Sequence, residues 1–189
     1  MLNRLDDAYF ERVYADRPDP WGFERRFYEK RKYALTLASL PRERYRRAFE
    51  PGCASGVLSE LLALRVDELI SMELVPTIAE RAHVRLRTHT NVRVDTGALP
   101  ETWTDGTFDL VVASEVLYYL RAEGLDRVVA LLAHGLEPGG HLVAVHWRLA
   151  TDYPLSGDVV HERLRTAPFL KLLGGYEQPE FRLDVFERT

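Results

Sequence analysis

Short apolar segments alternate with helix-like segments along the chain from Tyr45 onward. The clearest apolar segment, residues 108–113, reads Phe-Asp-Leu-Val-Val-Ala and is almost continuously hydrophobic. Such a run is typical of a strand that is covered on both faces of a parallel sheet. We therefore expect an α/β fold with helices on both faces of a mostly parallel sheet.

The expected strands are residues 47–50, 68–73, 92–95, 108–113 and 142–147, and the expected helices are residues 56–64, 76–86, 125–136 and 158–164. Residues 137–140, Glu-Pro-Gly-Gly, signal a turn. Two last strands, residues 169–173 and 181–187, flank Gly174 and Gly175 and would form a hairpin. The whole pattern predicts a Rossmann-like doubly wound sheet, mostly parallel, with an antiparallel C-terminal strand.

The chain has 189 residues and a hydrophobic content of 46%, which is enough for one buried core. We expect a single domain over residues 1–189, in which residues 45–189 form the core and residues 1–44 form a helical lid. The lid segment interleaves aromatic residues with charges, and its Asp19-Pro20-Trp21-Gly22 sequence predicts a turn between short helices.

The charge balance, 25 Lys and Arg against 29 Asp and Glu, argues against nucleic acid as a partner. No stretch approaches the roughly 18 apolar residues that span a bilayer, so we expect no membrane insertion. Cys53 is the single cysteine, and the N-terminus lacks the apolar core of a signal peptide. These features favour a cytoplasmic location. The oligomeric state stays open between a monomer and a homodimer.

A turn of small residues joins the first expected strand to the first expected helix, in the sequence Glu50-Pro51-Gly52-Cys53-Ala54-Ser55-Gly56. Small residues let the backbone approach a ligand closely, and the start of a helix offers unpaired N–H groups. Glu73 ends the second strand, where a carboxylate can accept hydrogen bonds from both hydroxyls of a ribose. The turn and Glu73 together predict an adenosine site.

The glycine spacing indicates which adenosine cofactor binds. A dinucleotide fingerprint needs a third glycine at the helix, whereas Val57 and Leu58 follow Gly56 here. Glu50 would repel a phosphate but favours the cationic amino-acid part of S-adenosylmethionine. We therefore expect S-adenosyl-L-methionine as the cofactor and S-adenosyl-L-homocysteine as its product. We expect no metal, because no His/Cys cluster has the spacing of a metal site.

These motifs resemble the class I S-adenosylmethionine-dependent methyltransferases, whose first motif commonly reads Glu-x-Gly-Cys-Gly-x-Gly. A closer resemblance is to the NodS-type N-methyltransferases. It rests on Asp19-Pro20-Trp21, on Glu29-Lys30-Arg31, on residues 50–56 and on residues 114–120, Ser-Glu-Val-Leu-Tyr-Tyr-Leu. The resemblance implies methyl transfer to a small-molecule acceptor, namely an amine such as an amino sugar.

The chain departs from the pattern of the class at three positions. Ala54 replaces the usual central glycine, and Pro51 removes one backbone donor. Gly97 stands where most of the class has an Asp that accepts from the adenine amino group. We therefore expect the backbone of residues 96–99 to hold the adenine, with Asp95 as a weaker alternative.

The expected cofactor-binding residues lie at the strand ends and in the lid segment. Arg31 can hold the methionine carboxylate through paired hydrogen bonds, and Tyr28 and Trp21 can help to close the site. A solvated, charged helix is the alternative for Arg31. The expected set is Trp21, Tyr28, Arg31, Glu50, Gly52, Cys53, Ala54, Gly56, Glu73, Leu74, Thr96, Gly97, Ala98, Ser114 and Glu115.

Residues expected to handle the acceptor follow the fourth and fifth strands, because open α/β sheets bind ligands at the carboxyl ends of their strands. The alternatives are a helix start capped by Ser114 and a histidine that is hydrogen-bonded at a strand end. The expected catalytic residues, which would orient the amine or take its proton, are Glu115, Tyr118 and His146. The expected substrate contacts are Tyr119, Trp147 and Arg148.

Other functions stay open on the same scaffold. An O-methyltransferase acting on an alcohol or carboxylate of a small metabolite would use the same motifs. A nicotinamide-dependent oxidoreductase is disfavoured by the missing third glycine. An adenosine-binding protein without catalytic activity is the remaining alternative.

Overall fold

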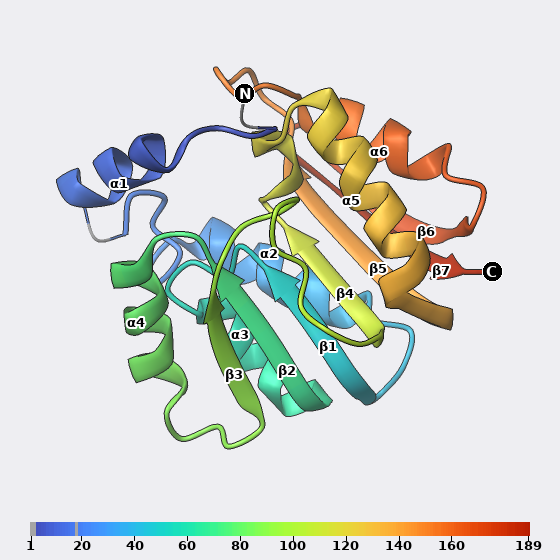
Figure 1. Ribbon diagram of the computed structural model, residues 1–189, viewed down its shortest axis with the longest axis horizontal. Coiled ribbons are helices and arrows are strands. Elements are labelled where there is room, and N and C mark those ends of the chain that lie inside the picture. The colour runs from blue at the N-terminus through green and yellow to red at the C-terminus, as the bar shows by residue number, and fades with distance from the viewer. Residues whose placement is uncertain (1–2, 18) are drawn as a thin grey trace.

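A seven-stranded sheet in the order β3-β2-β1-β4-β5-β7-β6 forms the centre of the computed structural model, which describes residues 3–17 and 19–189 (Figure 1). Strands β1 to β5 pair in parallel, and β7 runs antiparallel between β5 and β6. The expected Rossmann-like sheet with an antiparallel edge is confirmed. In chain order the elements are α1 (Asp7–Asp16), α2 (Phe27–Ala38), β1 (Tyr45–Pro51), α3 (Val57–Leu62), the 3-10 turn η1 (Ala63–Arg65), β2 (Val66–Glu73), α4 (Pro76–Leu86), β3 (Val92–Thr96), β4 (Phe108–Ser114), the 3-10 turn η2 (Leu117–Tyr119), α5 (Ala122–Gly135), β5 (Leu136–Trp147), α6 (Gly157–Arg165), β6 (Leu170–Glu177) and β7 (Phe181–Arg188).

Helices cover both faces of the sheet (Figure 1). Helices α5 and α6 lie on one face and α2 and α3 on the other, while α4 packs on β2 and β3. The buried residues of α5 include Leu125, Val128, Val129 and Leu132, which recur at helical spacing and so form one apolar stripe. Within the described residues, no helix combines the length and the apolar character needed to cross a membrane.

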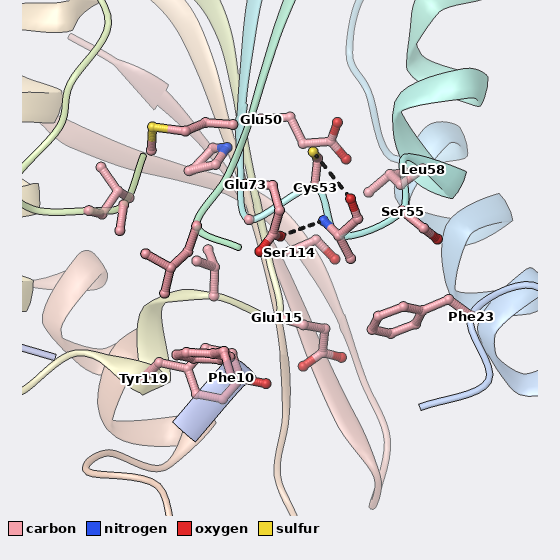
Figure 2. Close-up of a pocket in the computed structure, with 18 of the residues that line it drawn as sticks. Phe10, Phe23, Glu50, Cys53, Ser55, Leu58, Glu73, Ser114, Glu115 and Tyr119 are labelled. Atoms are coloured by element: carbon pink, nitrogen blue, oxygen red, sulfur yellow. Dashed lines mark hydrogen bonds between the residues drawn. The ribbon is translucent and has the colours of Figure 1, made fainter. Parts of the chain in front are cut away.

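The chain leaves β1 and β4 toward opposite faces of the sheet, which opens a crevice at the carboxyl ends of these neighbouring strands. Glu50 lies near the end of β1, Glu73 ends β2, and Glu115 follows β4 directly. Figure 2 shows these three carboxylates around one cavity. The topology thus places charged groups from distant parts of the chain in one site.

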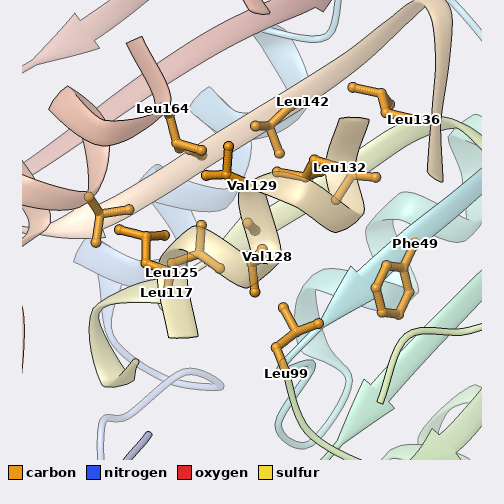
Figure 3. Close-up of a cluster of buried hydrophobic side chains, with 14 of the residues drawn as sticks. Phe49, Leu99, Leu117, Leu125, Val128, Val129, Leu132, Leu136, Leu142 and Leu164 are labelled. Carbon is orange, nitrogen blue, oxygen red and sulfur yellow. The ribbon is translucent and has the colours of Figure 1, made fainter. Parts of the chain in front are cut away.

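Two clusters of buried apolar residues fill the spaces between the sheet and its helices. On one face, Val129 and Leu132 of α5 pack with Phe49 and Leu142 of the sheet in a cluster to which Leu164 of α6 also belongs (Figure 3). Burial of a leucine or phenylalanine side chain stabilises a fold by about 1.5–3 kcal/mol. These clusters hold the strands, and therefore their carboxyl ends, in a fixed arrangement.

The turn expected at residues 137–140 is wrong, because this segment lies inside β5. Phe108 pairs with Leu136 and Leu110 pairs with His141, so residues 137–140 bulge out of the ladder. Gly139 has a φ of +72°, a left-handed conformation that glycine adopts readily. The glycines therefore serve a bulge within the strand and do not reverse the chain.

The expected C-terminal hairpin is confirmed, since β6 pairs antiparallel with β7, but Gly174 and Gly175 do not form its turn. Both residues lie within β6, whose register with β7 shifts between Leu172 and Gly174. The hairpin turns at residues 178–180, where the Gln178 N–H donates to the carbonyl of Phe181. A Cβ atom on Gly175 would lie 2.5 Å from Asp184 Oδ1, so glycine here permits the close approach of the two strands.

A buried ionic cluster around Asp184 ties α6 to β7. Asp184 is 1% exposed, and it accepts hydrogen bonds from His161 Nδ1 at 2.8 Å and Arg165 Nη2 at 2.9 Å. Arg182 Nε lies 3.1 Å from the same carboxylate. Burial alone would raise the pKa of Asp184, but the contacts with His161, Arg165 and Arg182 outweigh it and lower the pKa to about 2.

Replacing Asp184 with alanine is expected to lower the free energy of unfolding by about 3–5 kcal/mol, because buried cationic partners lose their acceptor. Urea denaturation at pH 7 measures this change. Glu187→Ala on the same strand is the matched control, since the Glu187 side chain is 37% exposed; we expect a loss of about 1 kcal/mol or less. An equal loss in both variants would contradict the assignment.

The lowered pKa of Asp184 predicts that the free energy of unfolding depends on pH. Because the folded-state pKa lies below the ordinary value of 3.8, the stability that Asp184 contributes is complete above that value. It is lost as the pH falls through about 2. The difference in the free energy of unfolding between the wild type and Asp184→Ala should therefore shrink as the pH falls from 3.8 to about 2.

Candidate active site

A cavity lies at the carboxyl edge of β1, β2 and β4, and the N-terminal segment covers it (Figure 2). Many of the expected site residues line this cavity. They are Trp21, Glu50, Gly52, Cys53, Ala54, Glu73, Leu74, Gly97, Ala98, Ser114, Glu115 and Tyr119. The cofactor turn and the segment after β4 are thus brought together as expected.

The turn after β1 packs tightly against neighbouring backbone. The N–H groups of Gly52 and Cys53 both donate to the carbonyl of Met72, at 2.7 and 3.0 Å. Gly52 has a φ of +75°, and a Cβ atom there would lie 2.8 Å from Val116 Cγ2. Glycine is therefore required at this position both for its conformation and for the space.

Glu73 is a buried carboxylate that backbone groups hold in place. Its Oε2 accepts from the Ala54 N–H at 3.0 Å, and its Oε1 accepts from the Val75 N–H at 2.9 Å. Burial raises the pKa of Glu73, although these N–H donors act in the opposite direction. A carboxylate has about four acceptor positions, so Glu73 retains acceptor capacity for a hydroxyl group in the cavity.

Glu50 lines the cavity, and its carboxyl group has a pKa close to neutral pH. It is 2% exposed, and its Oε2 accepts from Ser59 Oγ at 2.5 Å and from Ser71 Oγ at 3.0 Å. Burial raises the pKa of Glu50 to about 7, although the two serine hydroxyls lower it. A positive charge placed in the cavity would therefore favour the ionised form of Glu50.

An aromatic cover from the N-terminal segment forms the outer wall. Tyr14 packs edge-on against Trp21, and Trp21 stacks on Phe23, each pair with ring centroids 5.4 Å apart. Phe10 packs edge-on against Tyr119 at 4.9 Å. All five residues line the cavity. The aromatic texture of this segment is visible in the sequence, but Phe10, Tyr14 and Phe23 were not predicted individually.

Glu115 lies in the cavity wall in an unusual conformation. Its φ is +56°, in the left-handed region that non-glycine residues seldom adopt. One carboxylate oxygen accepts from the Tyr118 hydroxyl at 2.7 Å and from the Trp147 N–H at 2.9 Å. The other accepts from Lys32 Nζ at 2.5 Å. Three donors therefore fix the direction of the side chain.

Tyr118 and Trp147 support Glu115 and do not line the cavity. Tyr118 is buried, and burial raises the pKa of its hydroxyl well above the ordinary value. The geometry therefore places Tyr118 behind Glu115, which disagrees with its expected direct role in catalysis. Trp147 contributes its backbone N–H, while its ring packs edge-on against Tyr28 at 5.7 Å.

Lys32 is a charged residue of this region that was not predicted. It is buried in α2 and pairs with Glu115 and with Glu29, whose Oε2 lies 2.9 Å from Lys32 Nζ. Burial alone would lower the pKa of Lys32, but the two carboxylates outweigh it and raise the pKa. The signal in the sequence is an acid three residues before a lysine, which charged surface helices also show.

His146 does not occupy a position where it could act as a base. It is fully buried, and its Nε2 accepts from the Leu117 N–H at 3.2 Å. Its Nδ1 therefore carries the proton and donates to His161 Nε2 at 3.1 Å. Burial lowers the pKa of His146 far below its ordinary value, and the neighbouring His161 and Lys32 act in the same direction. Both ring nitrogens are occupied, so the expected catalytic role disagrees with the structure.

Arg31 and Arg148 lie away from the cavity, beside the C-terminal hairpin. Arg31 donates to Gln178 Oε1 at 2.9 Å and to the Tyr176 hydroxyl at 2.7 Å. Arg148 pairs with Asp158 at 2.9 Å and Glu177 at 2.9 Å. These contacts occupy the guanidinium groups, so the expected contacts of Arg31 with the cofactor and of Arg148 with the substrate disagree with this placement.

Three further expected residues lie outside the cavity lining. Gly56 is the N-cap of α3 with a φ of +78°, and a Cβ atom there would lie 3.1 Å from Leu86 Cδ1, so this glycine serves helix packing. Tyr28 lies beneath Lys32, whose Nζ is 5.3 Å from the ring centroid. Thr96 is exposed at the end of β3.

The wall expected to hold the adenine is formed by the segment after β3. Gly97, Ala98 and Leu99 line the cavity, and the Gly97 N–H donates to the carbonyl of Glu73 at 3.0 Å. Asp95, the weaker alternative, pairs with Arg93 at 3.0 Å and lies outside the lining. The backbone of this segment therefore fits the expected contact better than the Asp95 side chain does.

The strand order and the cavity beside the acid that ends β2 define the fold of the class I S-adenosylmethionine-dependent methyltransferases. Residues 8–144 match the family model described as Nodulation protein S (NodS). The chain belongs to the NodS family, and the resemblance seen in the sequence is confirmed.

Individual relatives agree with this assignment. Nodulation protein S of Rhizobium tropici is 33% identical over 127 residues, which are 66% of this chain and 53% of that protein. The chain thus matches about half the length of this relative. The structure of N-methyltransferase NodS from Bradyrhizobium japonicum WM9 in complex with S-adenosyl-L-homocysteine is 26% identical, with a TM-score of 0.83 over 96% of this chain and 97% of that chain. A Pseudomonas syringae protein assigned as a methyltransferase is 43% identical, with a TM-score of 0.77 over 86% of this chain and 100% of that chain.

The raised pKa of Glu50 predicts a pH dependence for the stability of the ligand-free protein. Because the folded-state pKa of about 7 exceeds the ordinary value of 4.5, the folded state binds an extra proton between these values. The associated stability is complete below pH 4.5 and is lost as the pH rises through about 7. Glu50→Gln removes the titration, so its melting temperature relative to the wild type should rise from pH 4.5 to pH 8. Glu60→Gln in α3, where the side chain is 45% exposed, is the control, and a pH-independent difference for Glu50→Gln would refute the assignment.

Proposed function

We propose that this protein transfers the methyl group of S-adenosylmethionine to the amine nitrogen of a small-molecule acceptor, such as an amino sugar. The observation that carries the proposal is the set of three carboxylates in the cavity, Glu50, Glu73 and Glu115. Negative charge favours both a sulfonium cofactor and an amine acceptor, whose nitrogen becomes positively charged as the methyl group is transferred. The related protein from Bradyrhizobium japonicum is an N-methyltransferase that binds S-adenosyl-L-homocysteine.

The cavity residues fit an adenosyl sulfonium. Glu73 retains acceptor capacity for a ribose hydroxyl beside its contacts with backbone N–H groups. Leu74 and Leu99 offer apolar surface for an adenine ring. Gly52 lacks a side chain, so the backbone of the turn can approach the ligand, and Glu50 lies beside it to balance a cationic amino group.

Methyl transfer requires alignment more than acid–base chemistry. When bound, S-adenosylmethionine supplies a methyl group activated by the sulfonium charge, which an unprotonated nitrogen in line with the carbon–sulfur bond can accept. Glu115 accepts a hydrogen bond from the acceptor's amine and so orients its lone pair. The aromatic cover of Phe10, Tyr14, Trp21, Phe23 and Tyr119 excludes water from the reacting groups.

An oxygen acceptor agrees less well with this cavity. A carboxylate acceptor would meet three acidic side chains, which repel it. An alcohol needs a base to remove its proton, and the expected base, His146, has both ring nitrogens occupied. The amine is therefore the acceptor that we propose.

A nicotinamide-dependent oxidoreductase is also disfavoured. Tyr28 and Lys32 have the Tyr-x-x-x-Lys spacing that some hydride-transferring enzymes use. Lys32 Nζ, however, pairs with Glu29 and Glu115, and neither Tyr28 nor Lys32 lines the cavity.

The single domain, the cytoplasmic location and the monomeric or homodimeric state expected from the sequence remain part of our proposal.

Isothermal titration calorimetry tests the cofactor. We expect binding of S-adenosylmethionine and S-adenosyl-L-homocysteine but not of NAD. Glu73→Ala should weaken binding by about tenfold or more, because the ribose hydroxyls lose a charged acceptor. Glu68→Ala, an exposed change on the same strand, should bind as the wild type does. Absence of heat with either adenosyl ligand from folded protein would refute the function.

A matched panel of acceptors tests the chemistry. Glucosamine, glucose and glucuronate offer an amine, an alcohol and a carboxylate on one ring, and benzylamine, benzyl alcohol and phenylacetate repeat the comparison on an aromatic ring. We expect a mass increase of one CH₂ on an amine and none on its matched alcohol or carboxylate. Transfer to a carboxylate in preference to the amine would refute the choice of acceptor atom.

A further inference from the structure

Lys32 bridges two carboxylates next to the cavity. Its Nζ lies 2.5 Å from Glu115 Oε1 and 2.9 Å from Glu29 Oε2, and its side chain is 3% exposed. The ring of Tyr28 covers it, with the centroid 5.3 Å from Nζ. A buried ammonium is unfavourable unless it is paired and hydrogen-bonded, so Lys32 is held in α2 by these acids.

The contact joins two parts of the structure that the backbone does not connect locally. Lys32 belongs to α2, whereas Glu115 follows β4, and 83 positions separate them in the chain. The second oxygen of Glu115 is bound by Tyr118 and by the N–H of Trp147. The Glu115 side chain is thus held through one oxygen by Lys32 of α2 and through the other by Tyr118 and Trp147.

The backbone conformation of Glu115 makes its contact with Lys32 important for the position of the Glu115 side chain. A φ of +56° is unfavourable for a residue with a side chain, and such strain persists where surrounding contacts impose it. Removing the Lys32 contact releases one oxygen and leaves two acids, Glu29 and Glu115, near each other without their shared cation. The repulsion between them then favours rotation of Glu115 away from α2.

We propose that Lys32 is a positioning residue for the methyl acceptor, which holds the Glu115 carboxylate at the cavity wall where the amine nitrogen binds. This inference rests on the function proposed above. Two acids against one base leave the cluster with one negative charge, so it stabilises the positive charge that forms on the amine nitrogen during methyl transfer, while Lys32 sets the direction of the carboxylate. Lys32 itself lies outside the cavity lining and acts through Glu115.

The first test needs no acceptor. Crystal structures of wild type and Lys32→Met, each with S-adenosyl-L-homocysteine, should show Glu115 turned from its position in the variant, whereas Lys32→Arg should retain it. The affinity for S-adenosyl-L-homocysteine, measured by calorimetry, should change less than about threefold, because Lys32 does not line the cofactor cavity. An unmoved Glu115 side chain in Lys32→Met would overturn the inference.

The second test measures acceptor use with benzylamine and glucosamine. Lys32→Met should lower kcat/KM for the amine by about tenfold or more, and Lys32→Arg should recover part of it. Binding of the same amine to the S-adenosyl-L-homocysteine complex should weaken in parallel. Lys30→Met, an exposed change in the same helix, should leave the kinetics unchanged.

The outcomes separate this inference from the proposed function. If the wild type binds the adenosyl ligands and methylates an amine while Lys32→Met does so equally well, the role of Lys32 is refuted and the function stands. If the wild type binds neither adenosyl ligand, the function fails and this inference fails with it. Should Lys32→Met not fold, the double variant Glu29→Gln with Lys32→Met removes the unpaired acid and is measured in its place.

Discussion

The shared direction of β1, β2 and β4 is the constraint on which the site depends. Parallel strands bring their carboxyl ends to one edge, so Glu50, Glu73 and Glu115 meet although they are far apart in the chain. Each acid is desolvated there, and each is compensated by different groups: serine hydroxyls for Glu50, backbone N–H groups for Glu73, and an ammonium with two further donors for Glu115. The three carboxylates thus have different hydrogen-bond partners within one cavity.

The N-terminal segment completes this edge, and its helix α2 also contributes Tyr33 to the apolar core. Helix α1 has no buried residue among those described, yet its Phe10 and Tyr14 line the cavity. Helix α2, in contrast, is anchored on both sides: Lys32 reaches Glu115, and Arg31 reaches the C-terminal hairpin. The N-terminal segment is therefore tied more firmly to the rest of the fold at α2 than at α1, and α2 carries the link to Glu115.

The sheet could be predicted from the sequence, because the hydrophobic periodicities of strands and helices do not depend on any single residue. The position of the cavity could be predicted because open α/β sheets bind ligands at the carboxyl ends of their strands. The details that failed depend on tertiary contacts. Neighbouring residues on a helix point about 100° apart, so the charged run around Arg31 and Lys32 could not be assigned to a face before the packing of α2 was known. Gly175 illustrates the same limit, since glycine there serves the approach of Asp184 and not a turn.

His146 shows why a strand-end residue of suitable chemistry need not be catalytic. Successive side chains of a strand point to opposite faces, and residue 146 points to the side of α6, where it meets His161. Its Nε2 accepts the Leu117 N–H, so it fixes η2, the turn that carries Tyr118 and Tyr119. The histidine therefore acts on the site through backbone geometry, in the same way that Lys32 acts through Glu115. What distinguishes the groups that face the ligand is the side of the strand end from which they project, and for the segment after β4 the left-handed turn at Glu115 sets that side.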